Sequence, residues 1–373
     1  MINPQLKRLA RVSLIYGAGT IINRFISFLL LPVFTKYLTP ADYGVSSILA
    51  FIAFFIQPVL TLGFGTSLGL CYFDQKTDEH KQSVIWSATV ILTASVAIVI
   101  VSAFLFSREI SQIAFQSPEY GNLVIISMLG TAATILVVPP MLYLQFEERA
   151  VSYVIASVLG SLISIGLMIY EVVFLLRGIL GLVEAIAIGQ AITLLLFLGI
   201  VAPKMKLTFS KSLGRALLRL GIPIIPGFAF VFLLQNANSY ILQYLKGLDA
   251  VGIYTVGFNL GLPIGMVIGA FGNAWTPFFL SFTDKKEEAV TLFRRITTYY
   301  VMGFGFLTFL FFAFAKPFVM VMTQPPFHGA YSVVGWSAAS QFFIGLFSVL
   351  LPAAYLAKEA KYITIIQGIA AVF

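Results

Sequence analysis

The sequence has little charge and almost no cysteine, and each shortage excludes a class of protein. Charged residues make up only 10% of the 373 residues, whereas a soluble domain carries about 25%. A water-soluble globular domain is therefore excluded. Cys71 is the single cysteine, which rules out an intramolecular disulfide and a metal site built from several cysteines. There is also no glycine-rich nucleotide loop, so we expect no cofactor, no metal and no ATP hydrolysis by this chain.

Long apolar segments dominate what is present. Hydrophobic residues make up 59% of the chain, and the mean hydropathy is +0.97. The apolar segments have the length of membrane-spanning helices, whereas the strands of a membrane barrel would be short and alternating. We therefore predict an all-α polytopic membrane protein. Ten complete spans are expected at residues 9–34, 45–73, 83–106, 123–146, 150–176, 179–202, 220–245, 251–282, 296–315 and 331–356.

The sequence repeats itself at an offset of 207 or 208 positions. Gly44 recurs as Gly252, and Asp42 recurs as Asp249. This register holds over more than sixty residues. Six spans per repeat is an even number, so both halves enter the membrane from the same side and are related by an axis along the membrane normal. The repeat thus predicts two six-helix-type bundles with a site between them, as in transporters.

The predicted domains follow from this repeat. Residues 1–203 form an N-terminal lobe of six transmembrane helices, and residues 220–373 form a C-terminal lobe of four complete helices and part of a fifth. The eleventh span starts at Tyr362 and stops at Phe373, which is too short to cross a bilayer. We therefore expect the second lobe to be truncated in its eleventh span.

A basic segment, residues 204–219, connects the two predicted lobes. Lys211, Arg215 and Arg219 follow one another at steps of four, with leucines on a neighbouring face. This pattern is typical of an amphipathic helix that lies on the membrane surface. We interpret the segment as a cytoplasmic linker, and the alternative is a surface that collects anionic lipid headgroups.

Lysine and arginine are distributed unequally between the two sides of the membrane. With the N-terminus placed inside, 17 of the 23 basic residues lie on that side and 5 lie on the other, while Arg24 lies within a span. The positive-inside rule therefore predicts a cytoplasmic N-terminus. The net charge of +8 is explained by this topology, and we expect no nucleic-acid partner.

The first span carries one charged residue, Arg24, near its middle. An arginine at that depth costs roughly 2.5–3.5 kcal/mol on insertion scales. Arg24 belongs to a helical face of seven polar or small residues: Ser13, Tyr16, Gly17, Thr20, Asn23, Arg24 and Ser27. A face of this kind looks into protein or a wet cavity, where the guanidinium could hold two phosphate oxygens. The alternative is an interior arginine paired with a carboxylate or with helix-end carbonyl groups.

Residues 24–45, RFISFLLLPVFTKYLTPADYGV, resemble the opening of prokaryotic polysaccharide flippases of the multidrug/oligosaccharidyl-lipid/polysaccharide (MOP) exporter superfamily. The second-lobe segment YLKGLDAVGIY at 244–254 agrees with this resemblance, which covers essentially the whole chain. It implies alternating-access transport, and no enzymatic activity, in a multi-pass protein of the prokaryotic plasma (inner) membrane. The implied substrate is an undecaprenyl-diphosphate-linked oligosaccharide, moved to the outer leaflet for O-antigen or exopolysaccharide assembly. The implied partners are membrane lipids, a polysaccharide polymerase and glycosyltransferases.

The candidate substrate-binding residues are polar side chains within predicted spans. They are Tyr16, Thr20, Asn23, Arg24, Gln57, Asn236, Asn238, Asn259 and Asn273. Amides suit sugars because they both donate and accept hydrogen bonds. Hydrogen bonding between helices explains the same residues equally well.

Two acidic residues within spans, Glu171 and Glu184, are candidates for coupling transport to H⁺ or Na⁺. Together with Arg177 they surround the turn between the fifth and sixth spans, so an ion cluster at the outer surface is the alternative. The membrane potential is a third candidate driving force, because an anion that leaves a negative interior gains free energy.

Two other functions remain open at this stage. A cation-coupled multidrug exporter of the same superfamily would need an acidic cavity, and deep carboxylates are scarce here. A membrane-embedded glycosyltransferase or polymerase could use an outward acid such as Asp42. Asp249 repeats this acid, however, which favours a helix-capping role for both.

Overall fold

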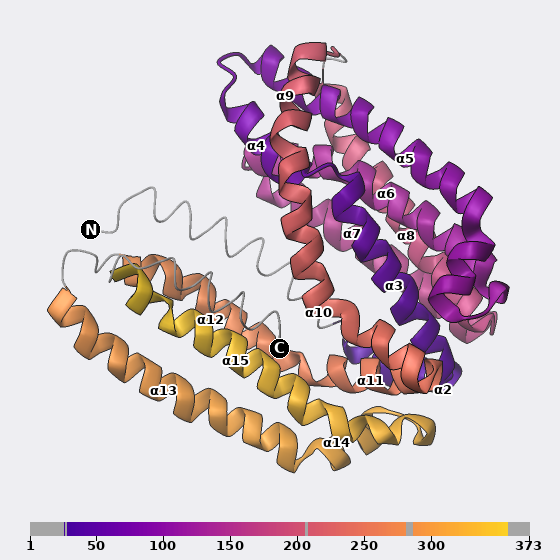
Figure 1. Cartoon of the computed structure of the whole chain (residues 1–373), viewed down its shortest axis with the longest axis vertical. Helices are drawn as coiled ribbons and strands as arrows, with labels where there is room; N and C mark the ends of the chain where they lie inside the picture. Colours follow the sequence, from indigo (N-terminus) through magenta and orange to yellow (C-terminus); the bar gives the residue numbers. More distant parts are fainter. Residues whose placement is uncertain (1–25, 27, 206–207, 281–285, 357–373) are drawn as a thin grey trace. The chain divides into compact units, whose positions relative to one another are not determined.

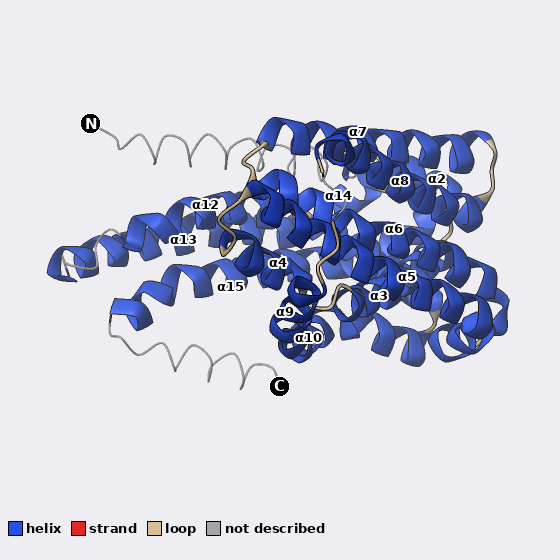
Figure 2. Cartoon of the chain, turned by 90° about the horizontal axis from the view of Figure 1, so that it is seen from above, coloured by secondary structure: helices blue, strands red, loops and turns tan. Residues whose placement is uncertain are grey.

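The computed structural model of the chain describes residues 26, 28–205, 208–280 and 286–356. Within these residues the chain consists of helices and connecting loops, and no strand is present (Figures 1 and 2). The helices of the first part are α2 (Leu31–Tyr37), α3 (Pro40–Leu60), α4 (Phe64–Phe73), α5 (Asp78–Phe115), α6 (Gly121–Phe146), α7 (Ala150–Ile169) and α8 (Gly178–Val201). Those of the second part are α9 (Lys211–Gly221), α10 (Ile225–Lys246), α11 (Leu248–Gly261), α12 (Pro263–Leu280), α13 (Lys286–Ala313), α14 (Ala315–Met322) and α15 (Tyr331–Leu356).

Seven helices or helix pairs within the described ranges are long and apolar enough to cross a membrane, and one bent pair makes up to eight. The prediction of an all-α polytopic membrane protein is therefore confirmed. The segment that begins at Tyr362, and most of the predicted first span, lie outside the described residues.

Both second spans of the sequence repeat are interrupted. The predicted span 45–73 is divided into α3 and α4 at Leu62 and Gly63, which have φ angles of 53° and 68°. The predicted span 251–282 is divided into α11 and α12 before Pro263, where the helix axis bends by 41°. Proline has no backbone N–H to donate, which explains the second break. Left-handed backbone angles end the α-helix at the first break.

The residue predicted as either a catalytic acid or a helix cap, Asp42, caps α3. Its carboxylate accepts a hydrogen bond from the backbone N–H of Thr39 at 2.8 Å, and the Thr39 hydroxyl accepts one from the N–H of Asp42 at 3.2 Å. This reciprocal capping box satisfies two backbone donors that a helix start otherwise leaves unpaired. Its repeat counterpart, Asp249, lies in the first turn of α11. Both positions thus begin the second span of a repeat.

The chain divides into two compact units, Met1–Gly252 and Ile253–Phe373. In the first unit α6 is the central helix. In its most apolar stretch 61% of the residues are buried, whereas the corresponding share in the other spans is at most 33%. It packs against α5 and α8 around fully buried side chains such as Leu92, Val124 and Ile135. Large apolar side chains on the outside, including Phe104 and Leu195, are more than half exposed, as expected for lipid-facing positions.

Small residues let α7 and α8 approach closely. A Cβ atom at Gly160 would clash with the side chain of Thr193, and one at Gly189 would clash with Ser164. Membrane helices commonly pack through such small residues, because lipid offers no hydrophobic driving force for their association.

In the second unit, α15 packs between α12 and α13 (Figure 1). Its core contains two aromatic side chains with polar ends. The indole N–H of Trp275 donates to the carbonyl of Ser348 at 3.2 Å, and the hydroxyl of Tyr300 donates to the carbonyl of Phe342 at 2.9 Å. Each ring therefore buries its apolar surface without leaving its donor unpaired.

Helix α10 packs along α3 and for this reason belongs to the first compact unit. The ring of Tyr240 stacks on that of Phe51 with centroids 5.8 Å apart, and the Ser47 and Ser239 hydroxyl oxygens are 3.5 Å apart. The lobe boundaries inferred from the repeat, at residues 203 and 220, are not decided by this packing and stay a prediction.

Candidate functional site

The structure places the predicted binding residues unevenly. Tyr16, Thr20, Asn23 and Arg24 lie outside the described residues, and so do the side chains of Asn236 and Asn273. Asn238 on α10 and Asn259 on α11 are exposed. Gln57 on α3 is half-buried and lines a cavity.

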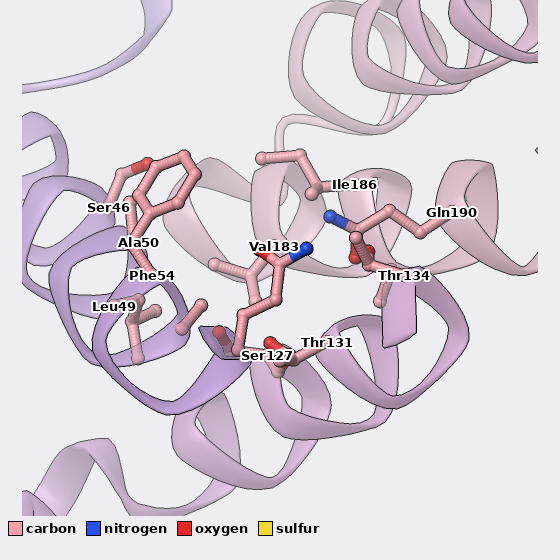
Figure 3. Close-up of a pocket in the computed structure, with 13 residues that line it drawn as sticks. Ser46, Leu49, Ala50, Phe54, Ser127, Thr131, Thr134, Val183, Ile186 and Gln190 are labelled. Carbon is pink, nitrogen blue, oxygen red and sulfur yellow. The ribbon is translucent and has the colours of Figure 1, made fainter. Parts of the chain in front are cut away.

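This cavity lies inside the first unit, between α3, α6 and α8, and has a volume of about 180 Å³. Figure 3 shows Phe54 and Ser46 of α3 on one side, with Gln190 of α8 and Thr134 of α6 opposite. Six uncharged polar side chains contribute to the lining: Ser46, Gln57, Ser127, Thr131, Thr134 and Gln190. The other lining residues are apolar, and no charged side chain of the described chain lines the cavity.

The two threonines of α6 present oxygen atoms rather than free hydroxyl hydrogens to the cavity. Thr131 donates its hydroxyl hydrogen to the carbonyl of Ser127 at 2.8 Å, and Thr134 donates to that of Gly130 at 3.2 Å. Each oxygen still has a lone pair that can accept a hydrogen bond. The threonines are therefore suited to accept hydrogen bonds from a ligand.

The two glutamines supply donors as well as acceptors. Neither the Gln57 nor the Gln190 side chain hydrogen-bonds to another residue of the described chain, so both amides are free to bind a ligand or water. Gln190 also lies closely on α6, because a Cβ atom at Gly130 would clash with its Oε1 atom and contact Ala187. Gly130 thus allows α8 to bring this amide to the cavity wall.

Sequence reasoning found Gln57 but missed the polar side chains contributed by α6 and α8. Ser127, Thr131 and Thr134 follow one another at steps of four and three, which places them on one helical face. The rule that was applied to the first span would therefore have found them. Gln190 had a weaker signal, as a single amide within an otherwise apolar helix.

The two predicted coupling residues form an ion cluster with Arg177. The Nη1 atom of Arg177 lies 2.7 Å from Oε2 of Glu171 and 2.5 Å from Oε2 of Glu184. The hydrogen bonds to Glu171 and Glu184 raise the pKa of Arg177 above its usual value. The cluster lies where a single π-helical turn, η2 (Tyr170–Phe174), leads into α8. This geometry holds the turn between α7 and α8 together, and the coupling role stays a prediction.

No group of three or more histidine, cysteine, aspartate or glutamate side chains comes together as a metal site within the described ranges. The chemistry that the cavity offers is hydrogen bonding from neutral groups beside apolar walls. Ligand pockets commonly combine these two kinds of surface.

Comparison with known proteins gives a family and a fold. The model of a family described as polysaccharide biosynthesis protein matches residues 9–283. No curated protein matches the chain. The fold is similar to that of the MATE multidrug transporter DinF-BH, with a TM-score of 0.66 and 17% identity over 96% of this chain and 84% of that one.

Two further solved structures have the same fold. An inward-facing multidrug resistance MATE family transporter of the MOP superfamily matches with a TM-score of 0.62 and 14% identity, over 90% of this chain and 87% of that one. The Vibrio cholerae MATE transporter VcmN in the bent form matches with a TM-score of 0.57 and 14% identity, over 95% of this chain and 84% of that one. This protein is thus a multi-pass membrane protein. It belongs to the polysaccharide biosynthesis protein family, and its fold is similar to that of MATE family transporters.

Proposed function

We propose that this protein flips an undecaprenyl-diphosphate-linked oligosaccharide from the cytoplasmic to the outer leaflet of a prokaryotic inner membrane, for cell-surface polysaccharide assembly. The observation that carries the proposal is the cavity between α3, α6 and α8, whose polar lining is uncharged. Sugar hydroxyls both donate and accept hydrogen bonds, and the glutamine amides and threonine oxygens can match them. Membership in a polysaccharide biosynthesis family supports a glycan as the cargo.

A cation-coupled multidrug exporter is the second candidate, and the fold shared with MATE multidrug transporters favours it. A cationic drug is stabilised in a membrane cavity by a carboxylate, because the attraction of opposite charges is strong where water is scarce. The described cavity offers no carboxylate, and Glu171 and Glu184 already bind Arg177. We therefore favour the glycan.

In the proposed cycle Arg24 binds the diphosphate within a wet crevice, while the isoprenoid tail stays in lipid. The two lobes then rock, and the headgroup emerges at the outer face. With the N-terminus in the cytoplasm, the membrane potential assists an anion that leaves by roughly 2.3 kcal/mol per charge per 100 mV. The cycle then requires no cofactor. Glycosyltransferases would build the substrate before it is flipped, and a polysaccharide polymerase would use it afterwards.

Complementation of a flippase-null strain tests this function. Wild-type protein should restore surface glycan, Arg24→Ala should lose export at normal membrane abundance, and Arg24→Lys should keep part of it. The cavity double variant Gln57→Leu with Gln190→Leu should also lose export. Gln112→Leu, which changes an exposed glutamine of α5, is the matched control and should export normally.

A second experiment expresses the same variants in a strain that lacks drug pumps and measures its susceptibility to cationic drugs. We expect no change in susceptibility to cationic drugs. Restored drug resistance without restored glycan export would replace the proposed function with the multidrug exporter. Full export by Arg24→Ala would remove that residue from the mechanism.

A further inference from the structure

Helix α9 has two different faces. Gly214, Leu217 and Gly221 form the buried face, which packs against α4 and α5. Lys211 begins a second face that continues through two arginines at steps of four, and all three basic residues are exposed: Lys211, Arg215 and Arg219. Residues four apart lie on one side of a helix. The three positive charges thus project together, away from the bundle.

Several contacts fix the orientation of this helix. The backbone N–H of Ser210 donates to the Ser87 hydroxyl of α5 at 3.0 Å. At the other end of α9, its backbone contacts the backbone between α3 and α4. A Cβ atom at Gly221 would clash with the carbonyl of Leu62, and a Cβ atom at Gly63 would clash with the carbonyl of Gly221. The basic face therefore cannot turn toward the bundle without losing these contacts.

The level of α9 relative to the bilayer follows from α5. The charge-free part of α5 before its kink at Phe106, residues 82–105, is 24 residues long, or roughly 36 Å. A hydrocarbon core is about 30 Å thick, so Ser87 lies near one of its edges. Because Ser210 contacts Ser87, the start of α9 lies at that edge, where lipid headgroups begin.

No carboxylate pairs with Lys211, Arg215 or Arg219 within the described part of the chain. Apolar side chains next to them, including Phe209 and Ile222, are about half exposed. Exposed basic residues beside exposed apolar ones are typical of a helix that lies in the membrane interface. A site for a soluble acidic protein would not need the apolar neighbours.

We propose that the basic face of α9, formed by Lys211, Arg215 and Arg219, binds the headgroups of anionic phospholipids in the bilayer. The bound headgroups hold the start of α9 at the interface, and the contact between Gly221 and Gly63 connects α9 to the break between α3 and α4. Helix α3 carries Gln57, so the lipid would also stabilise one wall of the cavity. This inference does not depend on which substrate the protein carries.

The test uses the purified full chain in phosphatidylcholine bilayer vesicles, in which part of the lipid is replaced by phosphatidylglycerol. The thermal unfolding midpoint of the wild-type protein should rise with phosphatidylglycerol and not with more phosphatidylcholine. The triple variant K211Q/R215Q/R219Q should lose this response, with an apparent affinity lower by on the order of 100-fold for three surface charges. The matched control R108Q/K246Q/K316Q removes the same charge from other exposed positions and should respond like wild type.

Salt provides an arm that needs no variant. In about 1 M salt the Debye length falls to about 3 Å, so the wild-type response to phosphatidylglycerol should disappear. A response that survives this salt, or a triple variant that responds like wild type, would overturn the proposal. If the basic face binds an acidic protein instead, the purified wild-type chain will ignore phosphatidylglycerol, which also overturns it.

Discussion

Gly44 and Gly252 occupy equivalent positions in the two sequence repeats, and each lies against the backbone of the other repeat. A Cβ atom at Gly44 would clash with the carbonyl of Leu248, and one at Gly252 would clash with the carbonyl of Pro40. Pro40 and Leu248 are 208 positions apart, as are the two glycines. The contact is therefore reciprocal, like the self-complementary interface of a two-fold symmetric dimer. Both glycines lie in the first compact unit, so equivalent positions of the two sequence repeats pack against each other there.

This relationship predicts that neither glycine tolerates even one added methyl group. Gly44→Ala and Gly252→Ala should each lower the free energy of unfolding by about 1–3 kcal/mol, because the two backbones must move apart. Unfolding of the purified protein measures the loss. Gly65→Ala is the control, since no atom lies within 4 Å of its added Cβ atom. If both variants are as stable as this control, the reciprocal contact does not hold the helices together.

The cavity predicts a difference between two threonines that make the same local hydrogen bond. Thr131 and Thr93 each donate to the carbonyl four residues earlier, at 2.8 Å, but only Thr131 lines the cavity. Thr131→Val removes an acceptor without changing the shape of the side chain, so transport should fall about tenfold for a hydrogen bond of about 1.4 kcal/mol. Thr93→Val should transport normally. Equal rates for the two variants would mean that the substrate does not contact this wall.

The ion cluster predicts a structural effect. Arg177→Gln leaves the Glu171 and Glu184 carboxylates without their shared partner, so the unfolding midpoint should fall, and it should fall less at high salt. The double variant Glu171→Gln with Glu184→Gln removes both negative charges, so no repulsion between carboxylates remains. This variant should keep transport. Loss of transport by the double variant at normal abundance, with a changed pH dependence, would instead assign these residues to ion coupling.

Much of the fold was predictable because a bilayer allows few solutions. Every backbone polar group in the hydrocarbon must be paired internally, so long apolar runs become helices. The capping role of Asp42 was also visible, since a threonine three residues earlier completes the capping box. The break at Leu62 was not visible, because leucine rarely adopts a positive φ angle. That break depends on the close approach of Gly221, about 160 residues later.

The candidate site was less predictable than the fold. Helical spacing can show that Thr131 and Thr134 share a face, but not that α8 brings Gln190 to the same cavity. That meeting depends on Gly130, which lets the two helices approach. Polar residues such as Asn238 fit the same composition rule and are exposed instead. Composition therefore identified candidates, and packing selected among them.

The most direct test of the central claim measures translocation by the purified full chain in lipid vesicles. A lipid-diphosphate oligosaccharide is placed in the inner leaflet, and its exposure to an external lectin is followed over time. We predict that wild-type protein exposes the glycan and that Gln57→Leu with Gln190→Leu slows exposure at least about tenfold, the equivalent of about 1.4 kcal/mol. No exposure above protein-free vesicles, together with transport of a cationic dye by the same vesicles, would contradict the account.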